Sequence, residues 1–495
     1  MKASTLGELK KSGWESVSVK EEIRRNLINK IRNKEELFPG ILGYEKTVLP
    51  QIQHALLSKH DMILLGLRGQ AKTRILRLMV NFMDEYIPIV KGSEINDDPF
   101  NPLSKFAKNL IEEKGDETPI DWLHRSFRYG EKLATPDTTV ADLIGDIDPI
   151  KAATKKLTLA DQNVINFGLI PRTNRGIFVI NELPDLQPRI QVALLNIMQE
   201  RDIQIRGFNV RIPLDIAMAF SANPEDYTNR GNIITPLKDR IDSQIITHYP
   251  KEMGIGMEIT RQEAWQERES RIKIHIPDLF RQTIERAAFE ARESEYVDQK
   301  SGVSTRMTIT ALEQVVSSAE RRAILNDEKE TSVRIADLYH MVPALTGKIE
   351  LVYEGEQEGA ISVAKHILGK AISKTFKVHF PDPQSKSEEQ KSVYKAVTDW
   401  FADGNEINIT DTLSNKEYEA ALKGVKGLKE LVDKYSEEIP KNEKSIWMDF
   451  VLEALHQNSM LSKQDLDDQT LYSDMLGSMF SSLGDYSDEG FDEFE

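Results

Sequence analysis

The amino-acid sequence predicts an α/β protein whose first domain is a doubly wound parallel sheet and whose later parts are mostly helical. Short apolar runs at residues 62–65 and 176–180 are typical of buried parallel strands. Segments with helical periodicity alternate with such runs, as in other doubly wound sheets. A glycine-rich turn directly follows the first strand, and ligands of these sheets bind beyond the carboxyl ends of the strands.

Composition limits the classes of protein that the chain can belong to. Its 495 residues exceed one compact core, so we expect two to four domains. The absence of cysteine excludes disulfides and thiolate metal sites in these residues. With neither a long apolar run nor a signal-peptide core, we expect a cytoplasmic protein without a membrane span. A net charge of −16 argues against broad binding to nucleic acid.

The first half of the chain contains the elements of the sheet. Residues 1–37 are expected to form an N-terminal arm with a basic helix at 19–32, whose charges face either an acidic partner or solvent. The α/β nucleotide-binding domain is expected at 38–250. Its predicted strands are residues 62–65, 86–90, 176–180, 215–221 and 243–247, with a helix at 190–199 and a hairpin at 203–213. Residues 92–137 are interpreted as a long polar connection with its own helix near 103–113.

The second half is predicted to be mainly helical. A helical domain is expected at 251–346, interrupted by a loop at residues 301–302. A C-terminal, mostly helical extension is expected at 347–475, in which 347–380 are ambiguous and 382–390 form a polar linker. The acidic end, 476–495, is expected to be a disordered tail.

The turn after the first strand matches the phosphate-binding pattern G-x-x-x-x-G-K-[ST] except that Ala71 replaces the second glycine. Small residues let backbone N–H groups surround phosphate oxygens, and the following helix N-terminus favours anions. Lys72 adds a positive charge for the β- and γ-phosphates, and the Thr73 hydroxyl can hold Mg²⁺. The residues expected to bind the nucleotide are Ile41, Leu42, Gly66, Gly69, Gln70, Ala71, Lys72, Thr73 and Arg74.

Polar residues at the ends of two later strands predict hydrolysis as well as binding. The strand at 176–180 ends in Asn181 and Glu182. Glu182 can polarise the attacking water, and Asn181 can accept a hydrogen bond from a water bound to Mg²⁺. Asn181 is neutral where a carboxylate is usual, so hydrolysis is either slow or secondary to nucleotide sensing. Asn223, after the strand at 215–221, can orient the water near the γ-phosphate.

Two arginines complete the predicted catalytic set. Arg240 lies at the edge of the sheet, where it can reach a neighbouring subunit's γ-phosphate, or pair within the chain with Asp239 or Asp242. Arg306 opens a helix in the following domain, where an arginine can clamp the phosphates and couple the domains to the nucleotide state.

Together these residues resemble the AAA+ ATPases, and within them the magnesium chelatase I-subunit and MoxR branch, the helix-2-insert clade. The P-loop of that branch often has alanine at the position of Ala71. The run at 138–152 is similar to the segment that opens the branch's insert in the helix before its acidic strand. Residues 168–182 resemble the run into the Walker B strand, the hairpin at 203–213 resembles the second insertion, and residues 96–99 resemble a further insertion of chelatase subunits.

The resemblance covers about residues 38–345. It implies a P-loop AAA+ parallel-sheet domain, a helical lid domain, the cofactors ATP and Mg²⁺, and a homo-oligomeric ring, commonly a hexamer. It also implies that Asn223 is sensor 1, that Arg240 is the arginine finger, and that Arg306 is sensor 2 and can act on a neighbour's nucleotide. Such motors usually work with a partner that carries a von Willebrand A domain.

Two functions follow as alternatives. The first is an ATP-hydrolysing, chaperone-like ring motor that remodels or loads a partner, of which metal insertion into a tetrapyrrole is one version. The second is a nucleotide-gated oligomeric scaffold with little hydrolysis, which the neutral Asn181 motivates. A DNA-bound activator is disfavoured by the acidic charge and the lack of a helix-turn-helix signal. Residues 346–495 resemble no known family and either set substrate specificity or stabilise the ring.

Overall fold

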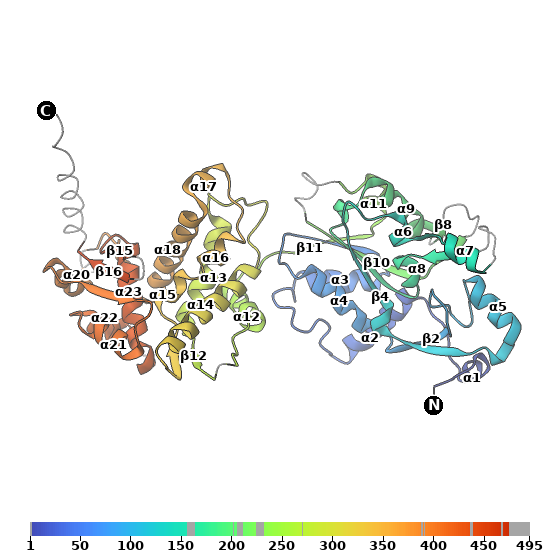
Figure 1. The fold of residues 1–495 in the computed structure, drawn as a ribbon, viewed down its shortest axis with the longest axis horizontal. Coiled ribbons are helices and arrows are strands. Elements are labelled where there is room, and N and C mark those ends of the chain that lie inside the picture. The colour runs from blue at the N-terminus through green and yellow to red at the C-terminus, as the bar shows by residue number, and fades with distance from the viewer. Residues whose placement is uncertain are drawn as a thin grey trace. The chain divides into compact units, whose positions relative to one another are not determined.

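The computed structural model describes residues 2–155, 164–200, 202–204, 211–223, 232–269, 271–387, 390, 392–435, 439–466 and 469–474. The chain divides into two compact units, Met1–Tyr249 and Pro250–Glu495. In Figure 1 the first unit runs from blue to green and the second from yellow-green to red. The predicted acidic tail at 476–495 lies outside the described residues.

A five-stranded parallel sheet forms the centre of the first unit, which confirms the predicted fold class. Parallel pairing joins β1 to β10 and β11, and β7 to β10 and β4. The carboxyl ends of β1, β10 and β7 therefore lie side by side. The strands, in their order across the sheet, are β11 (Ser243–Ile246), β1 (Met62–Leu65), β10 (Ile216–Ala222), β7 (Gly176–Asn181) and β4 (Tyr129–Leu133).

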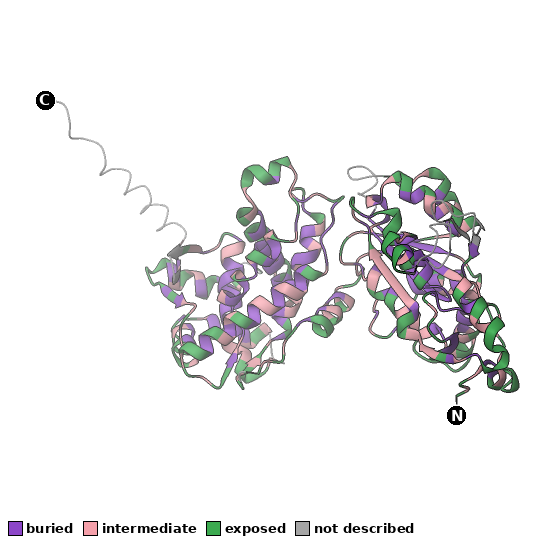
Figure 2. Cartoon of the chain, turned by 45° about the vertical axis from the view of Figure 1, so that its right-hand side comes forward, coloured by how far each residue is buried: buried purple, intermediate pink, exposed green. Residues whose placement is uncertain are grey.

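Alternate residues of the strands pack on opposite faces of this sheet, as the period of a β-strand requires. Leu64 and Val179 belong to a buried cluster with α2 (Val19–Arg32), α3 (Val48–Leu57) and α4 (Lys72–Leu78). Their neighbours Ile63 and Ile180 belong to a second cluster on the other face. That cluster includes residues of α6 (Val140–Leu143), α8 (Leu169–Arg172), α9 (Pro188–Glu200) and α11 (Thr235–Arg240). Figure 2 shows the buried strands between the two helical layers.

The predicted strand at residues 86–90 is confirmed, but it does not join the central sheet. Residues 86–90 form β2 (Tyr86–Val90), which pairs in antiparallel fashion with β3 (Ile120–His124) in a separate two-stranded sheet. The edge of the central sheet is β4, within the segment predicted to be a polar connection. The helix predicted in that segment is correct and is α5 (Lys105–Lys114). The residues of β4 are only partly buried, so the strand has no apolar run. Its hydrophobic pattern therefore did not predict a strand.

The N-terminal helices belong to the first unit. α1 (Leu6–Lys11) precedes α2, which occupies the predicted range and buries Val19, Ile23 and Leu27. Several of its basic residues pair within the chain, as in the 2.7 Å contacts of Arg25 with Asp84 and of Lys20 with Asp61. The sequence suggested that these charges face either solvent or an acidic partner. Neither alternative includes the ion pairs within the chain, because those involve residues far along the sequence.

Two insertions lie on the sheet domain. One contains α6, β5 (Gly145–Ile147), α7 (Pro149–Lys155) and β6 (Ile165–Phe167), with β5 antiparallel to β6. The other contains β8 (Asp202–Gln204) and β9 (Arg211–Pro213), which pair as the predicted hairpin requires. The turn of that hairpin, residues 205–210, lies outside the described residues. Short 3-10 turns occur at η1 (Met79–Phe82), η2 (Gly115–Glu117), η3 (Arg125–Arg128) and η5 (Leu183–Asp185).

The second unit is mainly helical, as predicted, and its buried apolar residues form one cluster that extends from α13 to α23. The long helix α18 settles the ambiguity of residues 347–380. The helices are α12 (Met253–Glu263), α13 (Asp278–Glu293), α14 (Arg306–Leu325), α15 (Ile335–Tyr339), α16 (Val342–Thr346), α17 (Tyr353–Glu358), α18 (Ala360–His379), α20 (Lys395–Ala402), α21 (Asn415–Lys423), α22 (Leu428–Tyr435), η6 (Lys441–Glu443) and α23 (Lys444–Gln457).

The second unit also contains strands that the sequence did not predict. β12 (Lys273–His275) and β13 (Glu330–Ser332) form a parallel pair. β14 (Ile407–Thr410), β16 (Gln469–Ser473) and β15 (Ser462–Leu466) form an antiparallel sheet in this order. These strands are short, and β12, β13 and β14 pair with segments far along the chain, whereas β15 and β16 are neighbours in sequence; runs of three to five residues give local periodicity little signal. Among the described residues, no helix is both long and apolar enough to span a bilayer.

Candidate functional site

The P-loop begins where β1 ends. The Gly66 N–H donates a 3.1 Å hydrogen bond to the Ala222 carbonyl at the end of β10. A Cβ atom at position 66 would lie 1.9 Å from Thr247 Oγ1 and 2.2 Å from Gln70 Oε1. Glycine is therefore the residue that fits this turn, which supports its assignment as the first glycine of the phosphate-binding pattern.

Three residues that sequence analysis did not assign hold the loop in place. Thr247 Oγ1 donates to Gln70 Oε1 at 2.6 Å, and Tyr249 donates from its hydroxyl to the Arg68 carbonyl at 3.0 Å. The Tyr44 hydroxyl lies between two carbonyl oxygens, 2.7 Å from that of His248 and 3.1 Å from that of Gln70, and its proton is shared between them. Burial raises the pKa of Tyr44 to about 12, so the hydroxyl remains a donor at neutral pH. Two of the three follow β11, far along the chain, and no local motif marks them.

The second half of the loop combines a strained residue with a buried lysine. Ala71 has φ = 57°, in the left-handed region, where a residue with a Cβ is less stable than glycine by about 1–2 kcal/mol. Lys72 is buried, and its Nζ donates to the carbonyl oxygens of Gly66 and Leu67, the latter at 3.0 Å. Thr73 follows in the first turn of α4, half-buried, and Arg74 is exposed.

Asn181 ends β7 in a buried position between two neighbouring strands. Its Nδ2 donates to Glu131 Oε1 of β4 at 2.8 Å. Its Oδ1 accepts a hydrogen bond from Ser221 Oγ of β10 at 2.8 Å. Sequence analysis missed Glu131 and Ser221, because nothing in their local sequence indicates that they flank Asn181.

Glu182 directly follows β7 and has an unusual backbone conformation. Its φ is 54°, in the left-handed region, and its side chain is half-buried. Non-glycine residues in this region store strain of about 1–3 kcal/mol and concentrate at functional sites.

Asn223 follows β10, and its side chain is buried with an unsatisfied acceptor. Its Oδ1 has no hydrogen-bond partner among the described residues. Leaving a buried acceptor unpaired costs about 1–3 kcal/mol. The strand register places the ends of β10 and β1 side by side, with Ala222 opposite Leu65. The unpaired oxygen therefore follows directly after a strand that neighbours the P-loop strand. Pro224, the next residue, lies outside the described residues.

The other predicted residues have different surroundings. Arg240 ends α11 and donates to Gln199 Oε1 and to the Pro236 carbonyl, both at 2.9 Å, rather than to Asp239 or Asp242. Arg306 is exposed at the first position of α14, in the second unit. Ile41 packs in the hydrophobic cluster of α2, α3 and α4, and Leu42 is half-buried.

The predicted magnesium ligands, Thr73 and Asn181, are compatible with a Mg²⁺ site to which the bound nucleotide contributes further ligands. Among the described residues there is no cluster of three or more His, Asp or Glu side chains that could hold a metal ion. Thr73 Oγ1 and Asn181 Oδ1 are neutral oxygen atoms. Mg²⁺ usually combines few protein oxygens with water and substrate phosphates, so these residues fit that mode of binding.

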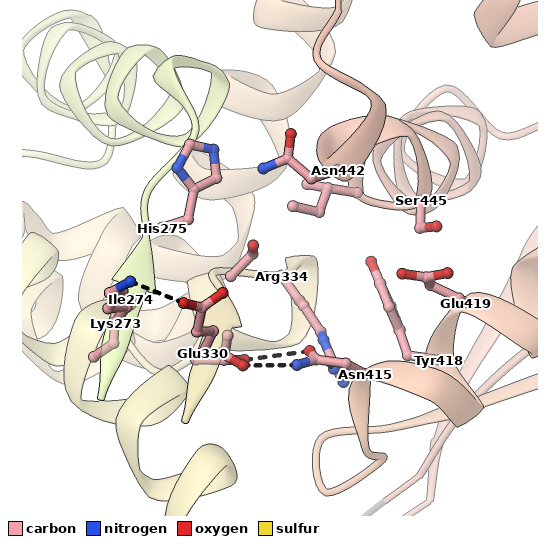
Figure 3. Close-up of a pocket in the computed structure, with 13 residues that line it drawn as sticks. Lys273, Ile274, His275, Glu330, Arg334, Asn415, Tyr418, Glu419, Asn442 and Ser445 are labelled. Atoms are coloured by element: carbon pink, nitrogen blue, oxygen red, sulfur yellow. Dashed lines mark hydrogen bonds and ion pairs between the residues drawn. The ribbon is translucent and has the colours of Figure 1, made fainter. Parts of the chain in front are cut away.

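A separate cavity of about 670 Å³ lies within the second unit. In Figure 3, Lys273 and Glu330 pair on one side, and Asn415 contacts the strand of Glu330. Arg334 is buried with its guanidinium 4.1 Å from the Tyr418 ring centre. Charges of both signs lie around this cavity, so its lining selects no class of ligand.

In sequence, the chain is similar to the magnesium-chelatase 38 kDa subunit of Cereibacter sphaeroides, with 27% identity over 154 residues. These residues are 29% of this chain and 43% of that protein, so the chain spans less than half the length of this curated relative. The match confirms the predicted resemblance to the magnesium chelatase subunits among the AAA+ ATPases. No protein-family model matches the chain.

Two solved structures are also similar to the chain. The complex between subunits BchI and BchD of magnesium chelatase, based on cryo-EM, has 20% identity and a TM-score of 0.33, covering 65% of this chain and 98% of that one. NtrX from Brucella abortus in complex with ATP has 14% identity and a TM-score of 0.39, covering 71% of this chain and 68% of that one. Scores this low add nothing to the argument about function.

Proposed function

We propose that this protein is an AAA+ ATPase of the magnesium chelatase I and MoxR type, which binds and hydrolyses ATP. The observation that carries the proposal is the convergence of polar groups at the carboxyl ends of three neighbouring strands. The P-loop with Lys72 follows β1, Asn181 ends β7 and Glu182 follows it, and Asn223 with its unpaired oxygen follows β10. This is the edge at which parallel sheets bind ligands.

Each group has a role in this proposal. The backbone N–H groups of the loop and the Lys72 ammonium hold the phosphates. When bound, Mg²⁺ supplies positive charge at the β- and γ-phosphate oxygens, and Thr73 and Asn181 offer oxygens for it or its water shell. Glu182 accepts a hydrogen bond from the attacking water, and Asn223 Oδ1 orients that water.

The assembly is also part of the proposal. Arg240 would complete a neighbouring subunit's site, and Arg306 would respond to the nucleotide, which requires a homo-oligomeric ring. We place this ring, commonly a hexamer, in the cytoplasm. Its ATP turnover would remodel or load with metal a partner that carries a von Willebrand A domain. The curated relative is named as a subunit of magnesium chelatase, which supports association with other subunits but does not identify a von Willebrand A partner.

Phosphate release by purified Glu182→Gln tests the proposal. We expect ATP binding to be retained and turnover to be lost, because the amide cannot take the role of the carboxylate at the water. Lys72→Ala, which should fail to bind ATP, is the control for contaminating ATPases. Equal turnover in Glu182→Gln and the wild type would contradict the role of Glu182. A wild type that assembles with ATP but releases no phosphate would instead support the scaffold alternative, which the neutral Asn181 favours.

A further inference from the structure

A carboxylate and an arginine lie on the sheet face where Asn181 ends β7. Glu131 of β4 shares this face with Asn181, because Leu133 is the register partner of Asn181 and alternate residues of a strand point the same way. Arg77 of α4 donates to both carboxylate oxygens of Glu131, at 2.8 and 3.0 Å. Helix α4 begins in the P-loop, so Glu131 connects the P-loop helix to the end of β7.

The contact between Glu131 and Asn181 determines which way the asparagine amide faces. An ionised carboxylate only accepts hydrogen bonds, so the NH₂ group of Asn181 must face Glu131, at the observed 2.8 Å. The carbonyl oxygen then faces β10, where Ser221 Oγ donates to it at 2.8 Å. The reversed amide would place two oxygen atoms in contact. Hydrogen bonds to a charged acceptor are about twice as strong as neutral ones.

We propose that Glu131 is a positioning residue, which fixes the Asn181 amide so that its oxygen faces β10 and the P-loop strand. An uncharged residue could then accept a hydrogen bond from the water shell of Mg²⁺, while the negative charge of Glu131 lies on the NH₂ side of the amide, opposite its oxygen. This inference rests on the proposed ATP site. It explains how a strand that ends in asparagine still serves that site.

A purely structural role for Glu131 predicts different behaviour. If the ion pair with Arg77 only joined α4 to β4, any variant that kept the pair would be normal. The Arg77 side chain is 65% exposed, and exposed pairs contribute only about 0–1 kcal/mol. The test must therefore separate the ion pair from the acceptor that faces Asn181.

Three variants make this separation. Arg77→Met removes the ion pair and keeps the acceptor. Glu131→Gln both donates and accepts, so it no longer selects one amide orientation. The double variant Arg77→Glu with Glu131→Lys keeps an ion pair but presents only donors to Asn181, which selects the reversed orientation. Circular dichroism and melting curves establish that each variant is folded.

The measurement is the affinity for a fluorescent, slowly hydrolysed ATP analogue, with Mg²⁺ and with EDTA. In the wild type, Mg²⁺ should tighten binding. This gain should stay within about twofold in Arg77→Met, weaken in Glu131→Gln, and fall about ten- to hundredfold in the charge-swapped variant, as when outer partners of a metal site are removed.

Two results would overturn the role of Glu131 and leave the proposed function intact. One is a wild-type Mg²⁺ gain in a folded charge-swapped variant. The other is an equal loss in Arg77→Met and Glu131→Gln, which would assign the effect to the ion pair. Failure of the wild type to bind the analogue at all would instead overturn the proposed function, and the positioning role with it.

Discussion

Polar groups have opposite surroundings in two regions of the molecule. They are fully hydrogen-bonded in the buried network around Glu453 in the second unit, but partly unsatisfied or strained at the strand ends of the first unit. The Glu453 carboxylate accepts hydrogen bonds from Tyr472 at 2.6 Å and from Lys463 at 3.1 Å, and from two further side chains. In the first unit, Asn223 keeps a buried oxygen unpaired and Glu182 has a strained backbone. A saturated network contributes stability, whereas unsaturated and strained groups mark a site that a ligand completes.

The two carboxylates of the second-unit network are themselves different. Burial by itself would raise the pKa of Glu453, but Lys463 and the donors around it lower that pKa to about 2. Burial raises the pKa of Asp449, one helical turn earlier in α23, to about 7. The network therefore keeps Glu453 charged at neutral pH, whereas Asp449 gains or loses its proton near that pH.

The largest effect is expected from a substitution that tests whether a neighbouring subunit's Arg240 completes the proposed ATP site. Arg240→Ala should leave ATP binding nearly unchanged and lower turnover about 10³–10⁵-fold, the contribution of an arginine supplied to a phosphoryl-transfer site. Phosphate release and analogue binding measure the two quantities. Arg261→Ala, an exposed arginine of α12 that lies outside the proposed site, is the control. Unchanged turnover in Arg240→Ala would remove Arg240 from the site.

The next largest effect is expected from removing one member of the buried network around Glu453. Lys463→Met leaves the buried Glu453 charge without its ion-pair partner and should lower the free energy of unfolding by about 3–5 kcal/mol. Urea denaturation followed by circular dichroism measures the change. Lys423→Met breaks the exposed pair with Glu419 in α21 and should change stability by less than 1 kcal/mol. Similar small effects of both substitutions would mean that the network is not a source of stability.

The pH dependence of stability tests Asp449. Its native pKa of about 7 lies above the ordinary value of 3.8, so the native state binds this proton more tightly than the unfolded state. The resulting stability is present below about pH 4 and is lost as the pH rises to 7, by at most about 4 kcal/mol. Asp449→Asn should remove that part of the decline. Parallel stability curves of the variant and the wild type from pH 4 to 7 would contradict the raised pKa.

The smallest effect concerns the strained loop. Ala71→Gly should relieve the left-handed conformation and raise the free energy of unfolding of the first unit by up to about 1 kcal/mol, after the greater flexibility of unfolded glycine is included. Ala420→Gly, in the exposed middle of α21, should lower stability by about 1 kcal/mol. Thermal melting of both variants tests for these opposite signs, and a loss in Ala71→Gly would show that the loop is not strained.

Local sequence predicted much of the first unit. The strand at 62–65 and the helix at 19–32 agree with β1 and α2 residue for residue, because the first is a continuous apolar run and the second has apolar residues at helical spacing. The P-loop was predictable because its function depends on consecutive residues. Ala71 departs from the pattern in sequence, but only the structure shows that it takes the left-handed conformation that glycine favours.

The sequence by itself determined the fold class, the P-loop and the residues that follow β7 and β10, since these depend on neighbours along the chain. Only the tertiary structure decided that the polar strand β4 lies beside β7, and that Glu131 therefore faces Asn181. The same holds for Thr247 and Tyr249, which hold a loop far earlier in the chain. The reason is physical: hydrogen bonds between distant segments depend on strand order and register, and neither leaves a trace in local periodicity.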